Sequence, residues 1–154
     1  MAKACLKARP LLPTKIIKPR PPSAMLILNL KSTCASARQT DNMSFTFKSA
    51  FQSSFQTISG FSVPYVSRIS GGLKAGKAIF IQGSVPSGCE SFVVNLKCGE
   101  SKENDIAFQI RTQFSSNCMV LNSRQHGAWG KRRNWTVLPL KQGSSFDLII
   151  AVKF

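Results

Sequence analysis

The sequence predicts an all-β protein, and this prediction rests on how apolar residues are spaced between residues 63 and 154. Short apolar runs alternate there with clusters of Gly, Ser, Asn and Asp, which is typical of an all-β chain. Within several runs apolar and polar side chains alternate, so that one face of each strand is buried and the other faces solvent or a ligand. No helical period of comparable length competes with this pattern.

The expected strands are separated by residues that favour turns. Ser70, Gly71 and Gly72 follow the first strand, and Pro86 follows the second. Glycine and proline at such places are typical of connections between strands. The seven expected strands are residues 65–69, 78–85, 91–96, 106–111, 118–122, 135–140 and 146–152.

Two neighbouring strands are expected to share an outer polar face. Their apolar residues should point into the core; these are Ile106, Phe108, Ile110, Met119 and Leu121. Gln109, Arg111 and Gln113 then project from the opposite face, about 7 Å apart, because alternate side chains point the same way. Val120 and Asn122 of the next strand would share that face. A shallow binding surface is one interpretation, and a merely solvated sheet face is the other.

The net charge of +15 raises the question of a polyanionic partner. Residues 1–42 hold eight Lys and Arg against Asp41 alone, so about half of the excess lies in that stretch. Neither a nucleic-acid-binding motif nor a basic-aromatic platform is evident elsewhere. Nucleic-acid binding is therefore the lowest-ranked function. A membrane span is not expected either, because no apolar run approaches the ~20 residues needed to cross a bilayer.

Composition divides the chain into three parts. Residues 1–42 are basic and proline-rich and are expected to form a disordered extension, with mitochondrial targeting as the alternative and Met43 as an alternative start. Residues 43–62 are a polar-aromatic linker to which no element is assigned. Residues 63–154 form the folded domain.

The chain lacks the residue clusters that enzymes and metal sites need. His126 is the single histidine, and the sequence contains no catalytic triad, no phosphate loop and no CxxC pair. We therefore expect no enzymatic activity, no metal and no cofactor. The five cysteines are expected to be buried structural thiols in a reducing compartment, and they are Cys5, Cys34, Cys89, Cys98 and Cys118.

The order of motifs from about residue 65 to the end resembles the first two thirds of a galectin carbohydrate-recognition domain. The matching stretches are Pro64-Tyr65, Gly71-Gly72-Leu73, Gly76, residues 79–85, Phe92, Val94-Asn95-Leu96, Asp105-Ile106-Ala107-Phe108, Asn122-Ser123-Arg124-Gln125, Trp129-Gly130, Pro139, Gly143 and Phe146-Asp147-Leu148. The resemblance implies a galectin-like antiparallel β-sandwich of the concanavalin A or jelly-roll type. It also implies binding of β-galactosides.

In that family, the strand opening Asp-Ile-Ala-Phe continues with His, Asn and Arg, which bind galactose. Gln109, Arg111 and Gln113 occupy those positions here. Asn122 matches the family's Asn that reaches the galactose 6-hydroxyl, and Trp129 matches the Trp that stacks on the sugar. A packing role is the alternative for Trp129. An unmatched buried polar group costs roughly 1–3 kcal/mol, whereas the whole binding free energy of a ligand with a millimolar Kd is only ~4 kcal/mol. Several replaced side chains are therefore expected to weaken galactoside binding.

The charge of the expected site is reversed relative to the family. The family's Glu and Arg after the Trp-Gly pair fall on Arg132 and Asn134. Arg111, Lys131, Arg132 and Arg133 have no obvious acid near them in the sequence. Since guanidinium groups pair well with sulfate and carboxylate, anionic glycans are expected ligands, and a solvated basic turn is the alternative.

The resemblance also implies that the domain is incomplete at its C-terminal end. A galectin domain continues beyond residues 146–152 with further strands, so Ile79, Ile81, Leu148 and Ile150 are expected to lose part of their cover. We therefore expect a marginal or aggregation-prone monomer, unless residues 43–62 or a second copy supply the missing strands.

Two functions rank nearly level. One is a lectin module for β-galactosides, and the other is a galectin-related interaction protein that does not bind sugar, favoured by the replaced site residues. The resemblance implies a cytosolic protein that also leaves cells by unconventional export.

Overall fold

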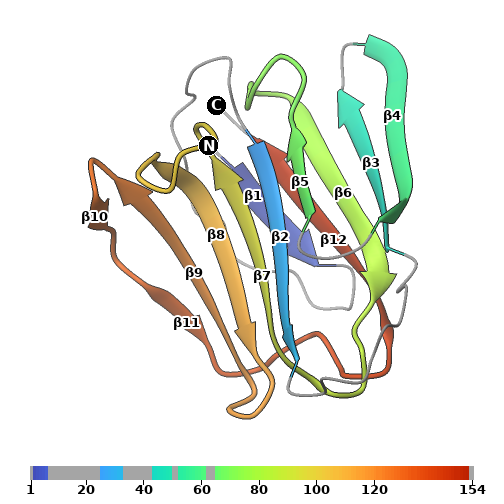
Figure 1. The fold of residues 1–154 in the computed structure, drawn as a ribbon, viewed down its shortest axis with the longest axis vertical. Coiled ribbons are helices and arrows are strands. Elements are labelled where there is room, and N and C mark those ends of the chain that lie inside the picture. Colours follow the sequence, from blue (N-terminus) through green and yellow to red (C-terminus); the bar gives the residue numbers. More distant parts are fainter. Residues whose placement is uncertain (1, 7–24, 33–42, 50–51, 62–64, 153–154) are drawn as a thin grey trace.

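The computed structural model describes residues 2–6, 25–32, 43–49, 52–61 and 65–152, and these residues form strands and loops without a helix (Figure 1). None of them therefore forms an apolar helix long enough to cross a bilayer. The strands are β1 (Ala2–Leu6), β2 (Met25–Ser32), β3 (Met43–Ser49), β4 (Gln52–Phe61), β5 (Tyr65–Arg68), β6 (Lys77–Ser84), β7 (Cys89–Lys97), β8 (Ile106–Gln113), β9 (Cys118–Gln125), β10 (Ala128–Trp129), β11 (Arg133–Trp135) and β12 (Ser145–Val152).

The strands form two antiparallel sheets, which makes the protein an all-β sandwich as predicted (Figure 1). One sheet has the order β1-β12-β6-β3-β4. The other has the order β10-β9-β8-β7-β2-β5, and β11 pairs with the same strand, β9, as β10 does. β8 and β9 thus lie near one side of the second sheet, beside the short strands β10 and β11.

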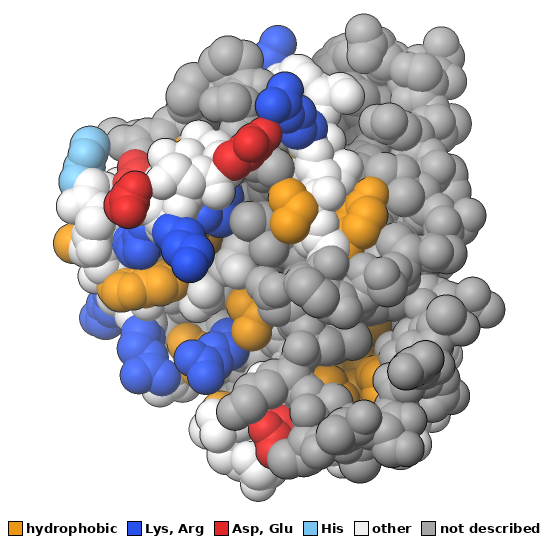
Figure 2. Space-filling model, viewed as in Figure 1, with side chains coloured by type: hydrophobic (Ala, Val, Ile, Leu, Met, Phe, Trp, Pro, Cys, Tyr) orange, Lys and Arg blue, Asp and Glu red, His pale blue; other side chains and the backbone are white. Residues whose placement is uncertain are grey.

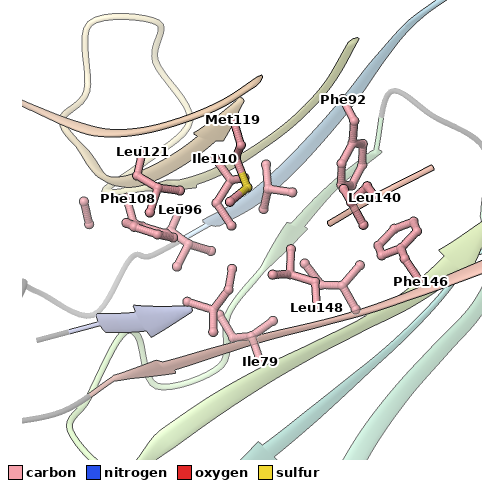
Figure 3. Packing of buried hydrophobic residues seen from close by; sticks show 14 of the residues in the cluster. Ile79, Phe92, Leu96, Phe108, Ile110, Met119, Leu121, Leu140, Phe146 and Leu148 are labelled. Carbon is pink, nitrogen blue, oxygen red and sulfur yellow. The ribbon is translucent and has the colours of Figure 1, made fainter. Parts of the chain in front are cut away.

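The core lies between the two sheets and is built by the alternation that the sequence predicts (Figure 3). Phe92, Val94 and Leu96 on β7 are fully buried, and on β8 Phe108 and Ile110 are each 1 % exposed. The Phe92 ring lies 5.3 Å from the Phe146 ring, centroid to centroid, which joins β7 to β12 across the sandwich. Burying these faces fixes the register of β7 and β8, because a slip of one residue would turn every apolar side chain outward.

The prediction of a disordered extension over residues 1–42 is wrong for two segments. β1 pairs with β12, and β2 lies between β7 and β5. Residues 25–30 are apolar except for Asn29, and all the prolines of the extension lie before them, so no proline interrupts strand pairing here. Residues 7–24 and 33–42 of the predicted extension lie outside the described residues.

Residues 43–62, which were expected to be a linker without elements, contain two strands. β3 pairs with β6 on one side and with β4 on the other. The physical reason is a period-two pattern, in which Phe45 and Phe47 alternate with Ser and Thr. The polar composition of the segment concealed this pattern.

The expected loss of core cover is also wrong. Ile79, Ile81, Leu148 and Ile150 are all between 0 and 2 % exposed. β3 pairs along β6, and β1 pairs along β12, so both strands that carry these residues have a neighbour on each side. We had expected this cover to be kept only if residues 43–62 or a second copy supplied the missing strands. β3, which lies within residues 43–62, is such a strand, because it pairs with β6.

The strand expected over residues 135–140 is mostly a loop. β11 ends at Trp135. Leu138 and Leu140 are nevertheless buried, and this gives the segment the alternating pattern of a strand. Pro139 between them lacks the N–H that pairing in a sheet requires.

Candidate functional site

The predicted polar face of β8 and β9 forms an open pocket on the outside of the second sheet. Its cavity volume is about 510 Å³, within the range of sites that hold small ligands. The lining residues come from β8, β9, β10 and the connection to β11, and they are Gln109, Arg111, Gln113, Cys118, Val120, Asn122, Trp129, Gly130 and Arg132. All six residues predicted for the site are therefore brought together.

The register of β8 and β9 explains why these side chains meet. Gln109 lies opposite Asn122, and Arg111 lies opposite Val120. Directly opposite residues of antiparallel strands point to the same face. Successive residue pairs of β8 and β9 thus line the pocket, while the opposite face of both strands is buried in the core.

Trp129 is placed by a tight two-residue turn between β9 and β10. Gln125 pairs with Ala128, and the two residues between them have positive backbone angles, with φ of 50° at His126 and 77° at Gly127. Positive φ at both central residues is the mark of a type I′ hairpin turn, which suits the twist of the flanking strands. The turn lays Trp129 beside β9, half exposed, with one side available to a ligand.

Asp105 fastens this turn to the start of β8. Its Oδ1 atom accepts a hydrogen bond of 2.7 Å from the backbone N–H of His126. On the other side of Trp129, the N–H of Gly130 donates to the carbonyl of Ser123 over 2.9 Å. The backbone is therefore held on both sides of Trp129.

Two amide side chains of the pocket are oriented by their neighbours. Gln109 donates through Nε2 to Oδ1 of Asn95 on β7, at 2.8 Å. Asn122 accepts at Oδ1 from the N–H of Ser123, at 2.9 Å. These bonds leave Oε1 of Gln109 as an acceptor and Nδ2 of Asn122 as a donor for a ligand.

The pocket is positively charged. Arg111 and Arg132 line it, and no acidic side chain is found among the described residues that do so. Figure 2 shows Lys and Arg side chains gathered around a hydrophobic one on the side of the molecule where Figure 1 places β8 to β11. Lys131 and Arg133, on either side of Arg132, are exposed and add to this charge.

Two cationic side chains hold the loop from β7 to β8 by hydrogen bonds to its backbone carbonyls. Lys97 donates to the carbonyl of Ser101 at 2.6 Å, and Arg124 donates to the carbonyl of Lys102 at 2.6 Å. Burial lowers the pKa of Lys97, and the nearby charge of Arg124 lowers it further, while Glu103 opposes the shift. The two side chains thus hold the segment from which β8 begins.

Sequence reasoning missed several residues of the site. Asn95 and Cys118 lie on the pocket side of their strands, and alternation with their buried neighbours was the signal that would have found them. The anchoring role of Asp105 had no such signal, because it depends on how a turn distant in sequence folds back. In the described part of the chain, His, Cys, Asp and Glu side chains form no group of three or more that could hold a metal ion.

These features define a β-sandwich protein with a polar and aromatic ligand pocket on one outer sheet face. The profile of the family described as galactoside-binding lectin matches residues 64–153, which is more than half of the chain. The chain belongs to this galactoside-binding lectin family, the galectins.

Individual galectins are similar to the same part of the chain. Galectin-4 of Bos taurus is 34 % identical over 91 residues, which are 58 % of this chain and 27 % of the relative. Human galectin-7 is 32 % identical over 88 residues, 57 % of this chain and 65 % of the relative. Human galectin-12 is 40 % identical over 91 residues, 56 % of this chain and 27 % of the relative. The chain thus spans less than two thirds of the length of each.

Proposed function

We propose that the chain is a carbohydrate-binding module for β-galactosides whose affinity is weakened or altered by substitutions in its site. The observation that carries the proposal is that Trp129 and Asn122 line one pocket with the polar row of β8. These are the two residues that match the family's sugar-binding positions. Membership of the galactoside-binding lectin family supports the ligand class.

The pocket offers what a pyranose needs. The half-exposed indole of Trp129 presents a flat apolar surface for the apolar face of a sugar ring. Asn122 has a donor free at Nδ2 and Gln109 an acceptor free at Oε1, which together match hydroxyl groups that both accept and donate. Each such hydrogen bond contributes roughly 1 kcal/mol to the binding free energy. Because the pocket offers only a few of them, we expect the Kd for a neutral galactoside to be near the millimolar range.

The proposed partners are glycans and glycoproteins that carry β-galactosides, with anionic glycans among them because of the charge of the pocket. We propose a non-enzymatic role without a cofactor, and self-association as a route to multivalent binding. The cytosol, with unconventional export from the cell, is a location proposed from the family alone.

A second candidate is an interaction protein that does not bind sugar. The replaced positions favour it, because Gln109, Arg111 and Gln113 stand where the family has His, Asn and Arg. A planar row of amides and a guanidinium on an open sheet face also suits a protein surface.

Titration of the full chain with lactose separates the two candidates. We expect a saturable change in tryptophan fluorescence with lactose and none with maltose, and we expect Trp129→Phe to weaken the change. Trp135→Phe is the matched control, because Trp135 packs against the core and does not line the pocket. Absence of a response to any galactoside would favour the interaction protein.

A further inference from the structure

We infer that Arg111 and Arg132 form an anion-binding subsite, which takes a sulfate or carboxylate group carried by the bound galactoside. The inference rests on the proposed function, because it assigns the charged part of the same pocket. It names the substrate class as acidic galactosides and gives a role to the two residues that bring a positive charge to positions where the family pattern has Asn and Glu.

The two guanidinium groups reach one cavity from different elements. Arg111 projects from β8, where it lies opposite Val120 of β9. Arg132 lies in the connection between β10 and β11, directly before Arg133, the first residue of β11, which pairs with Leu121 of β9. Both arginines are exposed and both line the same 510 Å³ pocket, so an anion binding between them would lose little of its contact with water.

Neither guanidinium is used inside the described part of the protein. Two other arginines there are engaged, since Arg68 pairs with Glu100 at 2.8 Å and Arg124 binds backbone carbonyls. No hydrogen bond or ion pair joins Arg111 or Arg132 to another described residue, which leaves their donors available to a ligand. An arginine carries five N–H donors and no acceptor, so two of them favour an acceptor-only group.

The acidic side chains of the β7–β8 loop are committed elsewhere. Glu100 binds Arg68, Glu103 accepts from the hydroxyl of Ser101 at 2.7 Å, and Asp105 binds the N–H of His126. Glu90, near the start of β7, is not among the residues that line the pocket. The described residues of the pocket thus supply no carboxylate to compensate the two arginines, and a ligand must bring the negative charge.

Sulfate and carboxylate share the chemistry that such a subsite recognises. Both present two coplanar oxygens to the fork of a guanidinium, and charge-assisted hydrogen bonds of this kind are about twice as strong as neutral ones. Because the pair is exposed, the attraction is screened by salt. Trp129 and Asn122 would hold the galactose ring, while the arginines would hold its acidic substituent.

The test compares four probes on the full chain by isothermal titration: lactose, 3′-sulfated lactose, 3′-sialyllactose and 3-sulfated glucose. We expect at least one acidic galactoside to bind roughly tenfold more tightly than lactose at low salt, and this advantage to shrink in high salt. Arg111→Gln and Arg132→Gln should each remove most of the difference in affinity between the acidic galactosides and lactose, with all three ligands measured on the same variant. Arg133→Gln is the matched control, because Arg133 is exposed and outside the pocket.

The outcomes separate the inference from the proposed function. Lactose binding that equals the binding of both acidic galactosides would overturn the anion subsite and leave the galactoside module standing. Failure of all three galactosides would overturn both. Sulfated glucose binding as tightly as sulfated lactose would show that the arginines do not serve a galactoside. A gain with only one acidic galactoside supports the inference and tells whether sulfate or the sialic carboxylate is the group recognised.

Discussion

The carboxylate of Asp105 accepts a 2.7 Å hydrogen bond from the backbone N–H of His126, and this contact ties the start of β8 to the turn that carries Trp129. Two parts of the pocket that are distant in sequence are therefore positioned by one side chain. The polar row of β8 and the aromatic wall share an anchor.

Replacing Asp105 tests this anchor. Asp105→Ala removes the acceptor, so we expect a loss of about 1 kcal/mol in the free energy of unfolding and faster quenching of Trp129 fluorescence by acrylamide. Asp105→Asn keeps an acceptor oxygen and should retain most of both properties. Equal quenching in the two variants would show that the contact does not hold the turn.

The turn itself makes a separate prediction. Gly127 has a φ of 77° and no neighbouring atom within 4 Å of the place a Cβ would occupy, so strain rather than crowding opposes a side chain there. Gly127→Val should cost about 1–2 kcal/mol in thermal unfolding and weaken lactose binding. His126→Asn should be tolerated, because Asn accepts the left-handed region well. A stable Gly127→Val variant with an unchanged lactose affinity would contradict the type I′ geometry.

The contact between Gln109 and Asn95 predicts a loss of orientation in the pocket. In Asn95→Ala the amide of Gln109 has no fixed partner, and we expect the lactose affinity to fall two- to fivefold, for a loss of about 0.5–1 kcal/mol. Asn95→Asp keeps the acceptor and serves as the control. The thermal midpoints of both variants should stay close to that of the wild type, since Asn95 is only partly buried.

Lys97 predicts a dependence of stability on alkaline pH. Its pKa in the folded protein lies below the ordinary value of 10.5, because burial disfavours the charged form. The unfolded chain then binds more protons in the interval just below pH 10.5, so folding gains stability as the pH rises through it. We expect the free energy of unfolding, measured by chemical denaturation, to rise more for the wild type than for Lys97→Met between pH 9 and 10.5. A constant difference between the two proteins would show that the pKa is not lowered.

The pairing of β1 with β12 predicts that the N-terminal residues protect a sheet edge. Deletion of residues 1–6 removes the partner of residues 148–152 and exposes a row of unpaired backbone groups. We expect a lower unfolding temperature and concentration-dependent self-association in sedimentation. A monomeric deletion variant with unchanged thermal unfolding would show that β1 contributes little to that edge.

The strands around the pocket were predictable because one of their faces is buried. In β7, β8 and β9 the apolar residues recur at every second position, and this both locates the strand and assigns each side chain to a face. The outer row with Gln109 and Arg111 follows from that rule alone. The outward position of Asn122 follows from it too, whereas Trp129 and the sugar-binding roles of both residues entered through the resemblance, which the family match supports.

Other elements were not predictable in the same way. β10 has only two residues, too few to show a period, and the loop around Leu138 and Leu140 copies a strand pattern because both leucines contact the core. β2 was hidden by averaging over a proline-rich stretch, although most of its own residues are apolar and none is a proline. The orientation of Gln109 depends on a side chain of another strand, and no local pattern encodes it.

The pairing of β1 with β12 also bears on how the protein forms. Leu6 is paired with Leu148, so β1 is synthesised long before β12, the strand that it pairs with. Contacts of such sequence separation slow folding, because a long loop must close before any pairing energy is gained. The pairing of β1 therefore forms only after β12 has been synthesised, and until then the nascent chain exposes an edge that chaperones can recognise.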